Sequence, residues 1–244
     1  FDVQPVFDED YLNILKVRME KRVTVMPEIN KNQAIRPNKG SVIPNNSGSA
    51  RGLHLNNDRM DVFALPGGGE TELIGNQEVA VLFQVTNEPE LDFHKLDAPL
   101  PEKAPTQAAL YKSSEIKHQM AIVHDQQKAD PNVSGLALHF SSEKREKMMD
   151  IHPSIALAMN SLDPNEVQRP HRHNSVALTL PIQSKNVYSV IEGEKVDWHQ
   201  YAIMITPPSH LHEHHNEGDE MMLSLVVQDG GLYYHLRTIG FSFG

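Results

Sequence analysis

Short apolar runs separated by turn-forming residues fill the last third of the chain. The runs are five to seven residues long and are rich in Val, Ile, Leu and Met, as is typical of buried β-strands. The turns between them contain Asn, Pro and Gly. Several short strands at regular spacing predict a small β-barrel or jelly roll. The predicted strands are Ile155–Met159, Ser175–Pro181, Asn186–Ile191, Ala202–Thr206, Met221–Val227 and Leu232–Leu236.

Residues 1–150 carry a mixed pattern. Leu12, Leu15 and Met19 fall near helical spacing, so residues 8–22 predict a helix. The stretch 30–60 is rich in Asn, Pro and Gly and predicts loops. The proline-rich stretch 86–106 predicts extended chain, and the charged stretch 141–150 favours a helix. Short apolar runs predict four strands, at Val62–Leu65, Val79–Val85, Met120–Val123 and Gly135–Phe140.

The two patterns divide the chain into an α+β segment over residues 1–150 and a β domain over residues 151–244. We expect a mainly β protein in which the C-terminal part forms the barrel. A degenerate second barrel inside the first segment is left open, because the strand pattern there is irregular.

Composition excludes several classes of function. The 244 residues include no run of 18 apolar residues, so no membrane span is expected. The formal net charge of −10 argues against non-specific binding to nucleic acid or to anionic lipid. Because the chain has no cysteine, thiolate metal sites, iron–sulfur clusters and disulfides are excluded. We expect a cytoplasmic protein, although the chain starts at Phe1 and its native start is not defined by the sequence.

Histidines concentrate where the strand pattern is regular. The chain has 14 His, and 8 of them lie between positions 171 and 235. On a β-strand, residues i and i+2 point to the same face, so His171 and His173 can present both imidazoles to one ion. The segment His210-Leu211-His212-Glu213-His214-His215 brings a second cluster. By the same alternation His210, His212 and His214 share a face, and any of them can approach the ion.

These segments resemble the cupin superfamily. The resemblance rests on Pro170-His171-Arg172-His173, on the turn Glu192-Gly193-Glu194, and on the stretch from Thr206 to Gly218. Within the superfamily, the region is similar to the C-terminal cupin domain of gentisate- and salicylate-type 1,2-dioxygenases. The resemblance implies a cupin jelly-roll barrel at 151–244 with His171, His173 and His212 as metal ligands. It also implies that His214 lies beside the substrate, as a base or hydrogen-bond partner.

Several positions depart from the family pattern. Many cupins place a carboxylate ligand four or five residues after the second His, where this chain has Ala177 and Leu178. The ring-cleaving enzymes share this three-His set. They usually carry an Arg at the position of Thr179 and a Trp at that of Leu211. The resemblance thus implies a retained metal site beside an altered substrate pocket.

The expected activity is that of a metal-dependent, ring-cleaving dioxygenase. Three neutral imidazoles leave a divalent ion its full charge and open positions for an anionic substrate and O2. Fe(II) suits this chemistry best, since zinc has no redox chemistry, but Mn, Ni and Zn stay open as cofactors. Two alternatives are a non-oxidative lyase, isomerase or hydrolase, and a small-molecule-binding cupin without turnover. We expect a hydroxylated aromatic or related small organic acid and O2 as substrates, no nucleic-acid or membrane partner, and a homo-oligomer.

Overall fold

The computed structural model describes residues 23–30, 52–55, 60–66, 72–75, 79–127, 136–148 and 150–244. The predicted helix at 8–22 and most of the predicted loop at 30–60 lie outside these residues. The chain divides into two compact units. The first lies within residues 1–61 and 65–104, and the second comprises Val62–Ala64 and Pro105–Gly244. The division into an α+β segment over residues 1–150 and a metal-binding β domain over residues 151–244 stays a prediction, as does the degenerate second barrel.

In the first unit, β1 (Val23–Asn30) pairs antiparallel with β5 (Val79–Val85), and β2 (Gly52–Leu55) pairs in parallel with β4 (Glu72–Gly75). The prediction of extended chain over 86–106 was wrong in part, because α2 (Glu88–His94) forms there and η1 (Pro101–Lys103) follows it. Pro89 lies in the first turn of α2, where a missing backbone N–H breaks no helical hydrogen bond.

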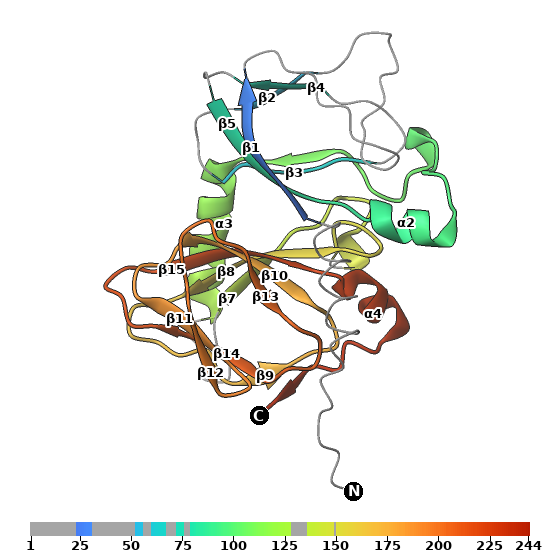
Figure 1. The fold of residues 1–244 in the computed structure, drawn as a ribbon. Helices are drawn as coiled ribbons and strands as arrows, with labels where there is room; N and C mark the ends of the chain where they lie inside the picture. Colours follow the sequence, from blue (N-terminus) through green and yellow to red (C-terminus); the bar gives the residue numbers. More distant parts are fainter. Residues whose placement is uncertain are drawn as a thin grey trace, which may run out of the picture. The chain divides into compact units, whose positions relative to one another are not determined.

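The second unit is built around two five-stranded sheets (Figure 1). One has the strand order β13-β10-β15-β8-β7 and the other β12-β11-β14-β9-β16. The first sheet comprises β7 (Leu136–His139), β8 (Ala156–Leu162), β10 (Ala177–Gln183), β13 (Met204–Thr206) and β15 (Met222–Gln228). The second comprises β9 (His171–Arg172), β11 (Val187–Ile191), β12 (Glu194–Asp197), β14 (His212–Asn216) and β16 (Ser242–Phe243). The prediction of a mainly β, jelly-roll protein is confirmed.

Two predicted strands are helices instead. Met120–Val123 lies inside α3 (Ser113–Gln127), and Leu232–Leu236 lies inside α4 (Gly230–Leu236). In both cases a short apolar run does not by itself distinguish a strand from a turn or two of helix. The charged stretch 141–150 contains only the short 3-10 turn η2 (Glu146–Met148) among its described residues. The small β3 (Val62–Ala64) and β6 (Ala109–Tyr111) pair with each other in the same unit.

The core between the two sheets forms where their inner faces meet. Leu162, Val187, Trp198 and Met222 make one buried cluster, and Met204 packs against it. Strand alternation directs these side chains inward, as the buried positions of β14 show at every second residue. A polar residue at one of these alternating positions therefore also faces the interior.

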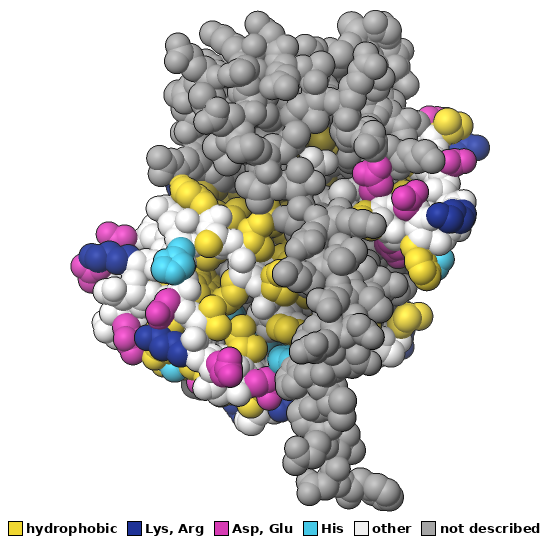
Figure 2. Space-filling view, in the orientation of Figure 1, with side chains coloured by type: hydrophobic (Ala, Val, Ile, Leu, Met, Phe, Trp, Pro, Cys, Tyr) yellow, Lys and Arg dark blue, Asp and Glu magenta, His cyan; other side chains and the backbone are white. Residues whose placement is uncertain are grey.

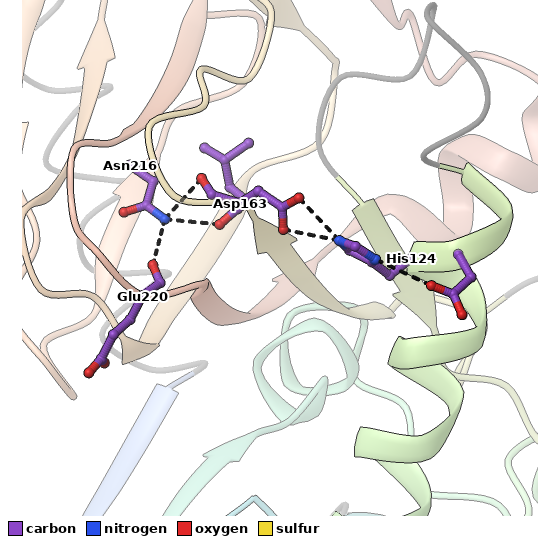
Figure 3. Close-up of polar contacts among 6 residues, drawn as sticks. His124, Asp163, Asn216 and Glu220 are labelled. Carbon is purple, nitrogen blue, oxygen red and sulfur yellow. Dashed lines mark hydrogen bonds and ion pairs between the residues drawn. The ribbon is translucent and has the colours of Figure 1, made fainter.

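Polar contacts fix α3 and the end of β14 to this unit (Figure 3). The His124 ring contacts both carboxylate oxygens of Asp163, at 3.0 and 3.1 Å. Asn216, 1% exposed at the end of β14, donates from its amide to the backbone carbonyls of Leu162, Asp163 and Glu220. Its own side-chain oxygen accepts from the backbone N–H of Gly218. The strand that carries His212 and His214 is thus pinned at its far end.

Surface properties agree with the composition. Acidic and basic side chains are interspersed on the face of the molecule shown in Figure 2. Within the described residues, no helix has the length and apolar character needed to cross a membrane.

Candidate metal centre

The site is built on the ladder between β9 and β14. His171 lies directly opposite His212 in this antiparallel pair, and residues in such positions share one face of the sheet. Their ring centroids are 4.2 Å apart. His173 follows β9 and keeps the same face, with its ring 4.9 Å from that of His212. His171 and His173 thus lie on the same side of the strand, the arrangement typical of i, i+2 spacing.

The structure brings these three side chains together in the interior. One ring nitrogen from each of His171, His173 and His212 lies within 4.8 Å of those of the other two. The three residues are 7%, 6% and 3% exposed. Three buried imidazoles that converge on the inner side of one sheet have the arrangement of a metal site.

Backbone carbonyls determine which nitrogen each ring offers. Nδ1 of His171 lies 3.0 Å from the carbonyl oxygen of Arg169, Nδ1 of His173 lies 2.8 Å from that of Ser175, and Nδ1 of His212 lies 2.9 Å from that of His210. Since a carbonyl only accepts, each Nδ1 carries the proton and donates it. Each neutral ring then keeps its lone pair on Nε2. This is the pattern by which proteins orient metal-binding histidines, so the residues present fit a divalent ion.

Neighbouring turns hold the two ligand segments in place. The backbone N–H of Ser209 donates to the carbonyl of His173 at 2.8 Å, which ties the loop before β14 to the residue after β9. The predicted turn at Glu192-Gly193 is a tight hairpin with positive φ at both residues, 49° and 85°. The Glu192 carboxylate accepts from the backbone N–H of Leu211, immediately before His212.

Electrostatics keeps the cluster neutral. Burial lowers the pKa of His171 and of His173, partly opposed by their hydrogen bonds to carbonyls. Burial, followed by the nearby His171, lowers the pKa of His212 to about 3. Neutral imidazole is the form that binds a metal ion, so the site is ready to bind one at neutral pH without releasing protons from these rings.

His214 lies next to the cluster but outside the converging set. Its ring centroid is 5.7 Å from that of His212, and burial lowers its pKa well below the ordinary value. Its Nδ1 is 2.7 Å from the hydroxyl of Ser189, and the indole N–H of Trp198 donates to the same hydroxyl at 2.7 Å. The sequence pointed to neither Trp198 nor Ser189 as part of the site. The available signal was a small polar residue on the buried face of an otherwise apolar strand.

Aromatic residues border His171. Phe241, 52% exposed, stacks on the His171 ring with centroids 5.3 Å apart. Phe243 contacts Phe241 edge-on, and the guanidinium of Arg169 lies 4.1 Å from the Phe243 ring centre. Thr179, at the position where the ring-cleaving enzymes usually carry Arg, is 2% exposed on the inner face of β10.

Three other histidines considered in the sequence are not part of the converging set. His210 precedes β14 and supplies its carbonyl rather than its ring to the cluster. His215 faces the opposite side of β14, where its ring stacks on Tyr188 with centroids 4.5 Å apart. His235 belongs to α4, and its side chain is outside the described part of the structure.

Comparison of sequences finds partial relatives, several of which are named as 1,2-dioxygenases. No family model matches the chain. A gentisate 1,2-dioxygenase from Ralstonia sp. is 31% identical over 90 residues, which are 37% of this chain and 25% of that protein. A 5-nitrosalicylic acid 1,2-dioxygenase from Bradyrhizobium sp. is 30% identical over 93 residues, 38% of this chain and 44% of that protein. The matches thus span between a quarter and less than half of these relatives.

Solved structures show the same fold. A salicylate 1,2-dioxygenase from Pseudaminobacter salicylatoxidans superposes with a TM-score of 0.51 at 18% identity, over 64% of this chain and 47% of that chain. A variant of this enzyme in complex with gentisate gives a TM-score of 0.53 at 18% identity, covering 64% of this chain and 46% of that chain. The fold is that of the cupin dioxygenases. Together with the sequence matches, it relates the chain to the cupin superfamily.

Proposed function

We propose that the chain is a non-haem Fe(II) dioxygenase that cleaves the ring of a hydroxylated aromatic acid. The observation that carries this proposal is the set of three buried imidazoles whose Nδ1 atoms are each tied to a backbone carbonyl. His171, His173 and His212 would hold the ion through Nε2. When bound, Fe(II) supplies the redox chemistry by which electron density passes from an aromatic substrate to O2, which zinc does not offer.

The surrounding residues would bind and orient the substrate. Three neutral ligands leave a net positive charge in a buried site, which favours an anionic substrate. His214, held through Nδ1 by Ser189, would use Nε2 for a hydrogen bond to a substrate oxygen. The half-exposed ring of Phe241 beside His171 offers an aromatic surface at the edge of the cluster. Arg169, close to Phe243, would attract the carboxylate to this edge.

Metal analysis followed by oxygen uptake tests the proposal. Protein purified without added metal, under conditions that protect Fe(II), should contain about one iron per chain, because the three histidines form one site. The iron-loaded protein should then consume O2 with at least one member of a panel of hydroxylated benzoic and naphthoic acids. Turnover that does not depend on O2, with Mn, Ni or Zn bound, would support a Lewis-acid enzyme instead. Failure to bind any of these metals after reconstitution would contradict the site.

A further inference from the structure

Gln228 is the last residue of β15 and comes from the sheet opposite the histidine ligands. It shares a face of this strand with Met222, Ser224 and Val226, all of which are buried. In the β10–β15 ladder it lies opposite Ala177. Of these two paired side chains, the Gln228 amide is the larger. The amide therefore extends from the inner face of one sheet toward the cluster on the other.

The amide contacts the nitrogen that His173 would use for a metal. Nε2 of Gln228 lies 3.3 Å from Nε2 of His173. At its other end, Oε1 accepts from the hydroxyl of Ser175 at 3.3 Å. Ser175 is fully buried, and its hydroxyl oxygen lies 3.0 Å from Nδ1 of the same His173 ring. Gln228 and Ser175 thus bracket both nitrogens of one proposed ligand.

From this contact we infer that Gln228 supplies a fourth, oxygen ligand to the ion that the three histidines would hold. The inference rests on the metal site proposed above. The N–H of Gln228 cannot donate to Nε2 of His173 when that lone pair binds a metal, so a bound ion requires the other orientation of the amide. Turning the amide by half a revolution exchanges its O and N atoms, which have nearly the same size. The oxygen then occupies the position beside Nε2, and the NH2 donates to Ser175.

The distance fits this assignment. Two ligand atoms that each lie about 2.0–2.2 Å from one ion, at angles between those of octahedral and tetrahedral geometry, are roughly 2.8–3.6 Å apart. The observed separation of 3.3 Å between the two side-chain atoms falls in this range. A neutral amide oxygen adds a ligand without cancelling the charge of the ion, so the site keeps its attraction for an anion.

Cobalt binding tests the ligand because Co(II) reports its coordination through visible absorption bands. The unmodified protein, Gln228→Leu and Gln228→Glu would each be titrated anaerobically with Co(II) against a competing chelator. Gln228→Leu should weaken binding about tenfold or more and change the visible spectrum. Gln228→Glu should strengthen binding about tenfold or more, because it replaces a neutral oxygen by a charged one. Gln183→Leu, at the far end of the neighbouring β10, is the matched control and should behave like the unmodified protein.

The outcomes separate the two proposals. If the unmodified protein does not bind cobalt, the metal site itself is refuted, and Gln228 with it. If it binds cobalt while both Gln228 variants keep its affinity and spectrum, the metal site stands and the fourth ligand is refuted. A Gln228→Leu variant with weaker binding but an unchanged spectrum would likewise overturn the assignment, because the amide would then act outside the coordination shell. Gln228→Glu keeps the shape of the side chain and an oxygen that accepts from the Ser175 hydroxyl, so its result stands even if Gln228→Leu folds poorly.

Discussion

Ser189 and His214 face each other directly across the β11–β14 ladder, with the Ser189 hydroxyl 2.7 Å from Nδ1 of His214. Because the indole of Trp198 already donates to that oxygen, the hydroxyl keeps its own hydrogen for a second partner. The Met204 sulfur lies 3.4 Å away, but an imidazole nitrogen is the stronger acceptor. His214 then carries its proton on Nε2, the opposite tautomer to the three proposed ligands. It would act as a donor toward a bound oxygen atom.

Replacing Ser189 by Ala should slow turnover while leaving the metal in place. Without the hydroxyl, His214 is free to change tautomer and the indole N–H of Trp198 loses its acceptor. We expect kcat to fall about tenfold or more, with a smaller change in KM, unchanged metal content and a loss of stability of about 1–3 kcal/mol. Ser189→Thr, which keeps the hydroxyl, should restore kcat. Steady-state kinetics and thermal unfolding measure both effects, and equal kcat values for Ser189→Ala and the unmodified protein would argue against the role.

Replacing His212 by Ala should abolish metal retention. The change removes one of three converging nitrogens and leaves the other two too few to hold a divalent ion tightly. His215→Ala is the matched control, because His215 lies three positions along the same strand with its ring on the opposite face. Metal content after dialysis distinguishes the two. Full retention in His212→Ala would show that the ligand set is different.

The metal-free protein should lose stability as the pH falls below neutrality. In the folded state the pKa of His212 is about 3 and those of His171, His173 and His214 are also lowered, whereas an unfolded His has a pKa near about 6.5. Below that value the unfolded chain binds more protons, so acid favours unfolding. The contribution is fully present above about pH 6.5 and declines as the pH falls toward the folded-state values.

Unfolding temperatures measured on metal-free protein between pH 7.5 and pH 5 should therefore decrease with pH. His212→Asn should show a shallower decrease, since it removes one of the groups responsible. If the two proteins have the same pH dependence, the buried imidazoles are not its source.

Removing the side chain of Asn216 should destabilise the barrel more than most single changes. The amide is nearly inaccessible and satisfies three backbone carbonyls and one backbone N–H. We expect Asn216→Ala to cost about 3 kcal/mol in the free energy of unfolding. Asn216→Asp should cost at least as much, because it points a carboxylate at three carbonyl oxygens. Urea denaturation measures both, and a loss within about 0.5 kcal/mol, the usual effect of a surface change, would contradict this.

The sequence predicted the strands of the barrel where short apolar runs lie between turn residues. Five of its six predicted strands, the exception being Leu232–Leu236, overlap observed ones. The strand β14 was not among the strands predicted from apolar runs, because His212–Asn216 is wholly polar; only the spacing of its histidines indicated a strand there. Strands as short as β9 and β16 have no periodicity to detect. The run Leu232–Leu236 favours a strand by residue type, but it forms a helix.

The candidate site shows the same limits. The i, i+2 spacing of His171 and His173 and the resemblance that selected His212 pointed to residues that the structure brings together. The sequence did not indicate Ser189 or Gln228, because their roles depend on cross-strand register, which places them opposite His214 and Ala177. Pairing between strands distant in sequence is set by the whole fold, so no local pattern reveals it.

The short strand β9 has one further consequence. It carries His171 and precedes His173, yet it is two residues long and is held on its outer side by β16, through pairs of Ser242 with Arg172 and of Phe243 with His171. Residues 241–244 thus hold the strand that carries the proposed ligands, although they lie some seventy positions away in the chain. A purification tag fused at these residues, or proteolysis there, would disturb the histidines as directly as a mutation beside them. A tag is therefore better placed elsewhere on the protein.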